Sequence, residues 1–461
     1  MSEAKAPDRR PRLAASTLDA VRTVSPPAYD RSGPAPYVHL GPGAFARAHL
    51  GVYADDLLIA GHPARVRAVA LRHGTAERQL GPQDGLYTVT TREPSAAPVT
   101  RIVGSFASVA TGAEAAVAAV ADPTTTLVTL TVTEHGYETT GPGSAAEVLA
   151  LGLEARRVAG HGGLVIASLD NLLDNGRVLR DQVLAVAADT GPPGLPEWIE
   201  ARVAFPGSVV DRMVPAPTDA DRVEVAERLG LVDEAAVVAE AHRSWVVEAV
   251  DGLPPLAAAD VEVVAGVGAH QQRKLWLLNA PHSALAYGGL LVGHDTIAAA
   301  VADPLVAGFV RRLVDDVLAV VDPTDGGPEP VGYAEDSLRR FANPALGHTC
   351  TQVGADGSRK LAQRVLPVVE ARRVRDLPVD RFAVVVAAWL AAVTGTPVQG
   401  RPLAAVEDPA AGELRAALGA SGPIAAAESA VGSALASWAP DVAAALDQLV
   451  EGGAGVLEST P

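Results

Sequence analysis

The chain has 461 residues, a length that favours two domains over one ordinary hydrophobic core. Hydrophobic residues make up 48% of it and charged residues 20%, as in a globular protein rather than a disordered one. The net charge of −17 argues against a nucleic-acid or anionic-membrane partner, because surfaces that bind phosphate are basic. Since Cys350 is the only cysteine, an intramolecular disulfide and a cysteine-based metal cluster are both excluded.

Residues 1–35 form a charged, proline-rich N-terminal extension without the apolar core of a signal peptide. No uninterrupted apolar run elsewhere reaches membrane-spanning length. These observations predict a cytoplasmic protein with no membrane partner.

The first strong motif is a glycine-rich turn that follows a short apolar segment, 37–40. Gly41-Pro-Gly43-Ala-Phe-Ala46 matches the pattern Gly-x-Gly-x-x-Ala, and a helix-compatible segment then reaches Leu58. Such glycines allow a tight bend and the close approach of a dinucleotide pyrophosphate at a helix N-terminus. The pattern alone is weak evidence, but its place between a strand and a helix predicts a dinucleotide-binding turn.

A second strand is predicted at 66–71, where this fold normally ends in an acid for the adenosine ribose of NAD or a base for the 2′-phosphate of NADP. The sequence continues Arg72-His73-Gly74-Thr75, with no acid before Glu77. The choice between the two cofactors therefore stays open. Arg72 is a candidate cofactor ligand, although solvation at a strand end is the commoner use of one arginine.

Strands and helices continue to alternate along the first half of the chain. We expect strands at 127–133, 164–168 and 243–249, and helices at 113–121 and 145–159. This alternation predicts a parallel α/β sheet, which binds ligands beyond the carboxyl ends of its strands.

Polar residues follow the strand that ends at residue 168. Asp170, Asn171 and Asn175-Gly176 are either pocket residues or helix-capping and turn residues. We interpret Asn175-Gly176 as helix-capping and turn residues and assign Asn171 to the pocket. The adjacent Asp211 and Arg212 are most simply a surface or interdomain ion pair of little energetic value.

After Gly266 the strand signals nearly vanish. Helices are predicted at 274–292, 307–321, 335–341, 361–368, 381–393, 407–420, 424–436 and 441–450, and the glycine-rich tail from 452 is expected to fray. The fold class is therefore α/β plus all-α, a Rossmann-type parallel-sheet domain (36–268) followed by a mostly α-helical domain (269–461).

Three polar residues interrupt an apolar run at 274–287. On a continuous α-helix, Lys274, Asn279 and His282 would lie within an arc of roughly 140°. Burying a lysine, an amide and an imidazole is costly unless they serve one another or a ligand, and a lysine in apolar surroundings can act as acid or base. In the alternative interpretation, Lys274 extends to water and His282 bonds a backbone carbonyl.

Eight segments in order resemble the polyol-specific long-chain dehydrogenase family, which includes mannitol 2-dehydrogenases, fructuronate reductases and tagaturonate reductases. The matching stretches are HLGPGAFARAHLGVYADDLL (39–58), LGPQDGLYTV (80–89), TVTEHGY (131–137), SLDNLLDNG (168–176), FPGSVVDRMVP (205–215), RSWVVE (243–248), KLWLLNAPHSALAYGGLLVG (274–293) and RFANPALGHTCTQVGADGSRKLAQRVLP (340–367). They span about seven-tenths of the chain.

The resemblance implies oxidation of a secondary alcohol at C2 of an acyclic polyol or aldonate by NAD, with NADP not excluded and no metal. It implies that Lys274 is the general base, that Asn279 donates to the developing alkoxide and that His282 holds substrate hydroxyls. Asn171 would bond the substrate and steady the lysine in a cleft between the domains. Asp211, Arg340 and His348 would bind substrate, and the predicted cofactor ligands are Gly41, Gly43, Ala44, Phe45, Arg72, Thr133 and Glu134.

The chain departs from the family's pattern at three positions. Pro281 stands where the family usually has a small residue, so either the helix kinks or a new helix begins with Asn279 as a partial cap. Leu169 replaces a residue that is often Cys, and the ribose-binding acid is absent. The pattern of Lys274, Asn279 and His282 is also the reason to prefer an enzyme to a non-catalytic dinucleotide-binding sensor.

Among substrates, D-mannitol/D-fructose is expected first. D-mannonate/D-fructuronate is the alternative, for which Arg340 or Lys360 supplies the cation that a carboxylate needs. The predicted partner is this small-molecule substrate, and the protein is expected to be a monomer or a weak homo-oligomer.

Overall fold

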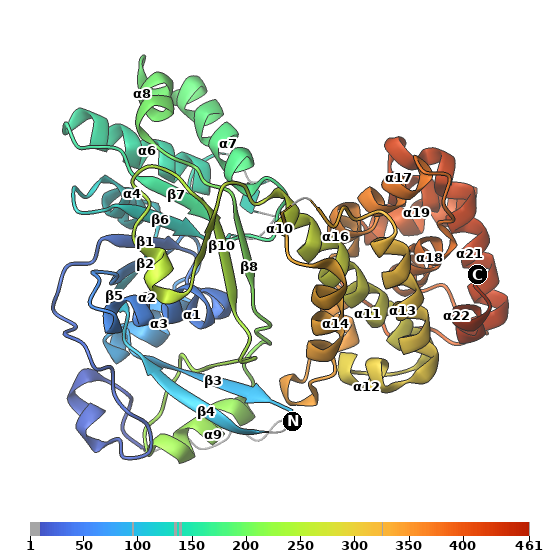
Figure 1. Cartoon of the computed structure of the whole chain (residues 1–461), viewed down its shortest axis with the longest axis horizontal. Helices are drawn as coiled ribbons and strands as arrows, with labels where there is room; N and C mark the ends of the chain where they lie inside the picture. Colours follow the sequence, from blue (N-terminus) through green and yellow to red (C-terminus); the bar gives the residue numbers. More distant parts are fainter. Residues whose placement is uncertain (1–9, 95, 133–135, 138–140, 325, 461) are drawn as a thin grey trace. The chain divides into compact units, whose positions relative to one another are not determined.

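The computed structural model describes residues 10–460 apart from 95, 133–135, 138–140 and 325. The chain forms two compact units, Met1–Val267 (unit 1) and Gly268–Pro461 (unit 2) (Figure 1). Strands dominate the centre of unit 1, whereas unit 2 is built from helices.

The centre of unit 1 is a five-stranded sheet in the order β5-β2-β1-β6-β7. Its strands are β5 (Phe106–Thr111), β2 (Val66–Ala70), β1 (Tyr37–Leu40), β6 (Leu127–Leu130) and β7 (Val165–Ser168). Every neighbouring pair is parallel, and the chain order reverses at β1. The Rossmann-type sheet predicted from the sequence is thereby confirmed.

Successive side chains of the central strands point to opposite faces of the sheet, and both faces are buried. Tyr37, Val66 and Leu127 pack into a core that includes residues of α2 (Leu50–Ile59). The core on the other face has strand residues such as Val38 and Val128 and the helices α4 (Ala113–Ala121), α6 (Ala145–Val158), α7 (Asn175–Thr190) and α8 (Leu195–Arg202). A sheet covered on both faces explains why these strands are almost wholly apolar.

Unit 1 also contains two small mixed sheets. One has the order β4 (Ala96–Val103), β3 (Tyr87–Glu93), β9 (Val237–Ala239), and the other β11 (Glu262–Val264), β10 (Ser244–Glu248), β8 (Ser208–Asp211). The remaining helices are α1 (Ala44–Ala48), α3 (Thr75–Leu80) and α9 (Asp219–Leu229). Strand β10 was predicted from its sequence, whereas β3, β4 and β5 were not, although Thr and Val recur along 87–111 as in half-buried strands.

Unit 2 has no extended strand among its described residues, and its mostly helical prediction is confirmed. Two helices form its centre: in α11 (Ala280–Val292) nearly every residue is buried, and in α18 (Asp380–Thr394) every residue from Phe382 to Val393 is. Helices apolar on all sides are typical of such central positions. The others are α10 (Gly268–Arg273), α12 (Ile297–Ala302), α13 (Pro304–Leu318), α14 (Pro330–Phe341), α15 (Cys350–Gly354), α16 (Gly357–Arg364), α17 (Leu366–Arg373), α19 (Ala411–Ser421), α20 (Pro423–Val431), α21 (Ala439–Gly452) and α22 (Val456–Ser459).

The C-terminal tail is ordered against unit 2, so the prediction that it frays was wrong. Val456 and Leu457 of α22 are buried, and α22 packs against α13. Arg312 donates a hydrogen bond to the Leu457 carbonyl oxygen at 2.7 Å. Two apolar side chains after the glycines give the tail enough buried surface to dock.

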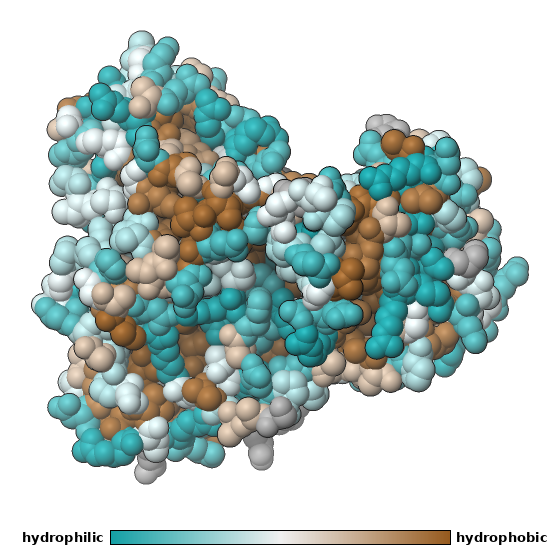
Figure 2. Space-filling model, viewed as in Figure 1, coloured by the Kyte–Doolittle hydropathy of each residue, from teal (hydrophilic) through white to brown (hydrophobic). Residues whose placement is uncertain are grey.

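The surface is mixed in polarity. Figure 2 shows hydrophilic residues over much of the visible face of each unit, with smaller hydrophobic areas between them. In the described part of the chain, each helix is too short or too polar to cross a lipid bilayer.

Candidate functional site

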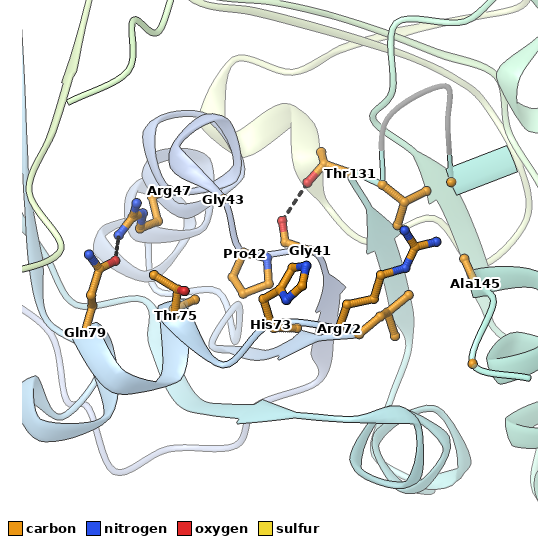
Figure 3. A pocket seen from close by; sticks show the side chains of 16 residues that line it. Gly41, Pro42, Gly43, Arg47, Arg72, His73, Thr75, Gln79, Thr131 and Ala145 are labelled. Atoms are coloured by element: carbon orange, nitrogen blue, oxygen red, sulfur yellow. Dashed lines mark hydrogen bonds between the residues drawn. The ribbon is translucent and has the colours of Figure 1, made fainter. Parts of the chain in front are cut away.

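A cavity of about 350 Å³ lies at the carboxyl ends of β1, β2 and β6 in unit 1. Residues after each strand line it: Gly41 to Gly43 after β1, Leu71 to His73 after β2, and Thr131 and Val132 after β6 (Figure 3). We call it the glycine-turn pocket. It lies where the strand order reverses, the position at which this sheet type binds its ligand.

The two glycines of the turn meet different requirements. Gly41 has φ +94°, and a Cβ there would lie 2.2 Å from the Thr131 carbonyl oxygen, so only glycine fits. Gly43 has an ordinary backbone conformation, and a Cβ there would meet only the Gly41 carbonyl oxygen at 3.9 Å. Gly41 is therefore needed to form the turn, whereas Gly43 keeps space open beside it.

The buried side chain of His39 forms hydrogen bonds at the glycine turn. His39 on β1 contacts the Thr129 hydroxyl through Nδ1 at 2.8 Å, and the Thr131 hydroxyl and the Gly41 carbonyl oxygen through Nε2 at 3.1 and 3.2 Å. Thr131 also donates to the Gly41 carbonyl oxygen at 2.8 Å (Figure 3). Burial lowers the pKa of His39 to about 4, so the ring is neutral at neutral pH. No role was predicted for His39 from the sequence.

The structure places the predicted cofactor residues in three groups. Gly41, Gly43 and Arg72 line the glycine-turn pocket. The side chains of Ala44 and Phe45 pack against the hydrophobic core of unit 1 instead. Thr133 and Glu134 lie outside the described residues.

Other lining residues were missed, among them Arg47, His73, Thr75 and Gln79. Arg47 is buried and donates to the Gln79 side-chain oxygen at 3.3 Å (Figure 3). It directly follows the glycine motif, so a cation next to a predicted phosphate-binding turn was the available signal. The cradle at Gly41 and Gly43 together with this buried cation fits the pyrophosphate of a dinucleotide.

Polar residues beyond β7 form a buried hydrogen-bond network. The Asp170 carboxylate accepts from the Val132 backbone N–H at 3.1 Å and the Tyr137 hydroxyl at 3.0 Å. Asn175, the first residue of α7, donates to the Ser208 carbonyl oxygen and accepts from its backbone N–H, both at 3.0 Å, which joins the start of α7 to β8. Asn175 thus has a structural role at a helix start, although Asp174 and not Asn175 is the N-cap of α7. Asn171 is half-buried in the same loop.

Asp211, the last residue of β8, and Arg212 after it are also buried, so of the two predicted positions for this pair, surface or interdomain, the surface one was wrong. Arg212 donates to the Glu240 carbonyl oxygen at 3.1 and 3.0 Å and to that of Ala48. Burial lowers the pKa of Arg212 to about 10. Asp211 lies 3.5 Å from His242 Nε2.

In unit 2, the segment carrying Lys274 and Asn279 is a π-helical turn. Residues Lys274–Asn279 lie between α10 and α11 in one uninterrupted helix, and the Ala280 N–H bonds the Leu275 carbonyl oxygen five residues back. Widening the turn brings residues five apart closer in angle than the roughly 140° of an α-helix, so Asn279 lies nearer to the face of Lys274. The roughly 140° arc, which assumed α-helix throughout, was wrong.

We infer that Pro281 causes this π turn. Its ring has no N–H and in an α-helix would collide with the carbonyl of Leu277, and widening the preceding turn relieves that collision. The helix neither breaks nor starts anew, and Asn279 makes no side-chain capping bond, so the capping alternative was wrong. The Asn279 side chain is 6% exposed, whereas Lys274 is half-buried.

His282 lies on α11 within an electropositive group of side chains. Its ring stacks on Phe341 with centroids 4.4 Å apart, and the His348 ring is 6.1 Å away. Its Nε2 atom is buried and has no hydrogen-bond partner in the described part of the chain. Burial, then His348, Arg364, Lys360 and Arg340, hold the pKa of His282 well below its ordinary value. A neutral imidazole with an unsatisfied buried nitrogen is suited to bind a polar ligand.

We call Arg340, Lys360 and Arg364 the cationic cluster. Arg364 is buried and donates to the Ser283 hydroxyl at 3.1 Å, and Lys360 donates to the Val353 carbonyl oxygen at 3.4 Å. Both lie on α16, whose first residue, Gly357, packs so closely that a Cβ would lie 2.3 Å from the Trp389 ring nitrogen. No role was predicted for Arg364 from the sequence.

The predicted catalytic and substrate-binding residues are divided between the two units. Unit 1 contains Asn171 and Asp211, and unit 2 contains Lys274, Asn279, His282, Arg340 and His348. In the described residues, no group of three or more His, Cys, Asp or Glu side chains is arranged to hold a metal ion.

Comparison with known families matches both units. Residues 36–257 match the mannitol dehydrogenase Rossmann domain, and residues 266–439 match the mannitol dehydrogenase C-terminal domain. A mannitol 2-dehydrogenase of Pyrenophora tritici-repentis is 32% identical over 92% of this chain and 80% of its own length. The D-mannonate oxidoreductase of Escherichia coli is 32% identical over 85% of this chain and 86% of its own length.

Among solved structures, the chain is similar to the Pseudomonas fluorescens mannitol 2-dehydrogenase in a ternary complex with NAD and D-mannitol. The TM-score is 0.86 at 28% identity, with 97% of each chain covered. A D-sorbitol dehydrogenase in substrate-free form has a TM-score of 0.82 at 25% identity, with 98% of this chain and 100% of that chain covered.

Proposed function

The chain belongs to the mannitol dehydrogenase family, and we propose that its substrate is the D-mannitol/D-fructose pair, with hydride transfer between C2 and NAD. It is an NAD-dependent polyol 2-dehydrogenase, as its relatives and the NAD- and mannitol-bound structural neighbour indicate. The observation that carries the residue assignments is the π turn, which holds Lys274 and Asn279 in one continuous helix with His282, whose buried Nε2 has no hydrogen-bond partner in the described part of the chain.

In this proposal each of the three residues has one task. Lys274 takes the proton from the C2 hydroxyl during oxidation and returns it during ketose reduction. The Asn279 amide donates to the oxygen at C2, where negative charge develops. The neutral His282 ring binds a neighbouring substrate hydroxyl and fixes its orientation. NAD, when bound, supplies the hydride acceptor.

The glycine-turn pocket supports the cofactor part of the proposal. Gly41 and Gly43 leave room for the pyrophosphate, and the buried guanidinium of Arg47 provides a positive charge beside it. The substrate roles of Asn171 and Asp211 stay predictions from the family resemblance.

Steady-state assays of the purified protein test this function. Oxidation of NADH is followed by absorbance with D-fructose, D-fructuronate and other ketoses, and reduction of NAD with the matching polyols and aldonates. We expect turnover with a C2 ketose. NADH binding without turnover of any substrate would instead favour the dinucleotide-binding sensor.

A second candidate substrate is the D-mannonate/D-fructuronate pair, which the cationic cluster favours. A carboxylate on the substrate would offset the charge of Arg340, Lys360 and Arg364, three cations that all act on His282. Of the two cations on α16, the half-exposed Lys360 can be substituted with less disturbance of packing than the buried Arg364. Lys360→Ala should raise KM for D-fructuronate at least about tenfold and leave KM for D-fructose nearly unchanged. Equal changes for both ketoses would argue against an aldonate site.

A further inference from the structure

The carbonyl oxygen of Gly41 has three hydrogen-bond donors around it. The Gly43 N–H lies 2.7 Å from this oxygen, the Thr131 hydroxyl 2.8 Å and the His39 Nε2 atom 3.2 Å. The bond from Gly43 closes a three-residue turn around Pro42, whose ring restricts its own φ. A peptide oxygen held by three donors cannot rotate without losing hydrogen bonds, so these contacts fix the peptide that joins Gly41 to Pro42.

The His39 ring connects the Gly41 oxygen to the interior of the central sheet. Its Nδ1 atom lies 2.8 Å from the Thr129 hydroxyl, and its Nε2 atom lies 3.1 Å from the Thr131 hydroxyl. Since the Gly41 oxygen can only accept, a neutral ring satisfies these contacts when Nε2 carries the proton and Nδ1 accepts from Thr129. The hydrogen bonds then run in one direction, from Thr129 through His39 to the Gly41 oxygen.

Two members of this network lie outside the glycine-turn pocket. The side chains of His39 and Thr129 are 0% and 1% exposed, and neither is among the described residues that line the pocket. Gly41 and Thr131 do line it, and Figure 3 shows the hydrogen bond between them. An effect of His39 or Thr129 on cofactor affinity must therefore pass through the shape of the turn.

We propose that His39 is a positioning residue for NAD, which holds the Gly41 carbonyl oxygen in the orientation that leaves the turn open to the pyrophosphate. A carbonyl oxygen carries a partial negative charge, so one that rotated towards the bound phosphates would repel them. The donors on the Gly41 oxygen offset this charge and oppose the rotation. The inference rests on the proposed function and deepens it, because it concerns the cofactor site of the same reaction.

Two substitutions of His39 separate positioning from stability. The side-chain amide of His39→Gln can place an N–H near the position of Nε2, whereas that of His39→Asn is too short to reach the Gly41 oxygen. We expect His39→Asn to raise the Kd of NADH at least about tenfold, and His39→Gln to raise it no more than about threefold. The turnover number at saturating NAD should stay within about twofold of the wild-type value in both, because neither variant alters the proposed proton-transfer residues. Fluorescence titration, steady-state kinetics and melting temperatures are measured on the same preparations.

Thr129→Val tests the same network one hydrogen bond further from the pocket. Valine has nearly the shape of threonine but cannot donate to His39 Nδ1, so the Kd of NADH should rise about threefold to fivefold. The matched control is Thr125→Val, which removes a buried hydroxyl that donates to the Ala119 carbonyl oxygen at 2.7 Å. It should lower the melting temperature without changing the Kd. If His39→Asn does not fold, this pair of variants decides the question.

Three results would overturn the positioning role of His39. They are wild-type NADH affinity in His39→Asn, equal losses of affinity in His39→Asn and His39→Gln, and equal losses in Thr129→Val and Thr125→Val. In all three cases the wild type still binds NADH, so the proposed function survives. If the wild type does not bind NADH, the cofactor assignment of the pocket falls together with the role of His39.

Discussion

The glycine-turn pocket and the π-helical segment are built by different parts of the chain. The pocket of unit 1 is shaped by backbone, since Gly41 approaches Thr131 too closely for any side chain. The site in unit 2 is made of side chains: Lys274 and Asn279 come from one helix turn, and the cationic cluster comes from α14 and α16. Backbone turns have strong sequence signatures, whereas side-chain clusters depend on how distant helices pack. The first site should therefore be sensitive to added volume, and the second to altered chemistry.

The largest effect is expected from Lys274→Ala. Removal of the proposed general base should lower turnover by about 10²- to 10⁴-fold. NADH affinity should stay nearly constant, because the glycine-turn pocket is formed by residues of unit 1. Single-turnover kinetics and a fluorescence titration measure the two quantities, with Arg311→Ala as the control. Near wild-type turnover of Lys274→Ala would contradict the assignment of Lys274 as the general base.

Gly41→Ala tests the backbone site. The added methyl group would lie 2.2 Å from a carbonyl oxygen at φ +94°, so we expect a lower melting temperature and at least tenfold weaker NADH binding. Gly61→Ala is the matched control, because its φ is +86° but nothing lies within 4 Å of the new Cβ. Gly61→Ala should therefore lose about 1 kcal/mol of stability from backbone strain alone, without a steric clash. Similar losses in both variants would show that close approach at Gly41 is unimportant.

Gly43→Ala separates binding from folding at the same turn. Its φ of −71° suits alanine and only the Gly41 carbonyl oxygen lies within 4 Å, so the melting temperature should hardly change. NADH should nevertheless bind more weakly, because the methyl group occupies space beside the turn. Unchanged binding would place the cofactor elsewhere.

Much of unit 1 could be predicted from sequence because its signals are local. The strands at β1, β2, β6 and β7 are short apolar runs, and Gly41 and Gly43 fall between a strand and a helix as expected. The neighbours of the turn could not be predicted, since Arg47, His73 and Gln79 meet only after folding. Likewise, β3 to β5 show the alternation of apolar and polar residues that is usual for strands, but they contain no recognisable sequence motif.

The site of unit 2 was predicted in composition but not in geometry. Lys274, Asn279 and His282 were identified, yet their relative placement was derived for a regular α-helix. Pro281 was identified as a disturbance, but sequence alone does not distinguish a kink, a new helix and a π turn. Arg364 was missed because an arginine on an amphipathic helix usually faces water, and its burial against Ser283 depends on how α16 packs.

The buried His39 predicts how stability depends on pH. Its pKa is about 4 in the folded chain against an ordinary 6.5, so the unfolded chain binds more protons between these values. The His39 contribution is therefore fully present above pH 6.5 and is lost as the pH falls towards 4, by about 3 kcal/mol in all. Thermal unfolding from pH 7.5 to 4.5 should show a smaller acid-induced decrease in His39→Gln than in the wild type. The control His161→Gln, at a partly exposed position, should keep the wild-type slope.

The smallest effect is expected from Pro281→Ala, which tests whether the proline maintains the π turn. Alanine restores an N–H that can bond the Leu277 carbonyl oxygen, so the segment should tighten towards α-helix and rotate Asn279 away from Lys274. Turnover should fall about tenfold, with a smaller change in KM, because a misplaced alkoxide donor acts mainly in the transition state. Pro304→Ala is the matched control, because Pro304 occupies the first turn of α13 without a π turn. It should leave turnover unchanged, and a crystal structure of Pro281→Ala that retains the π turn would show that packing around α11, rather than the proline, sets the geometry.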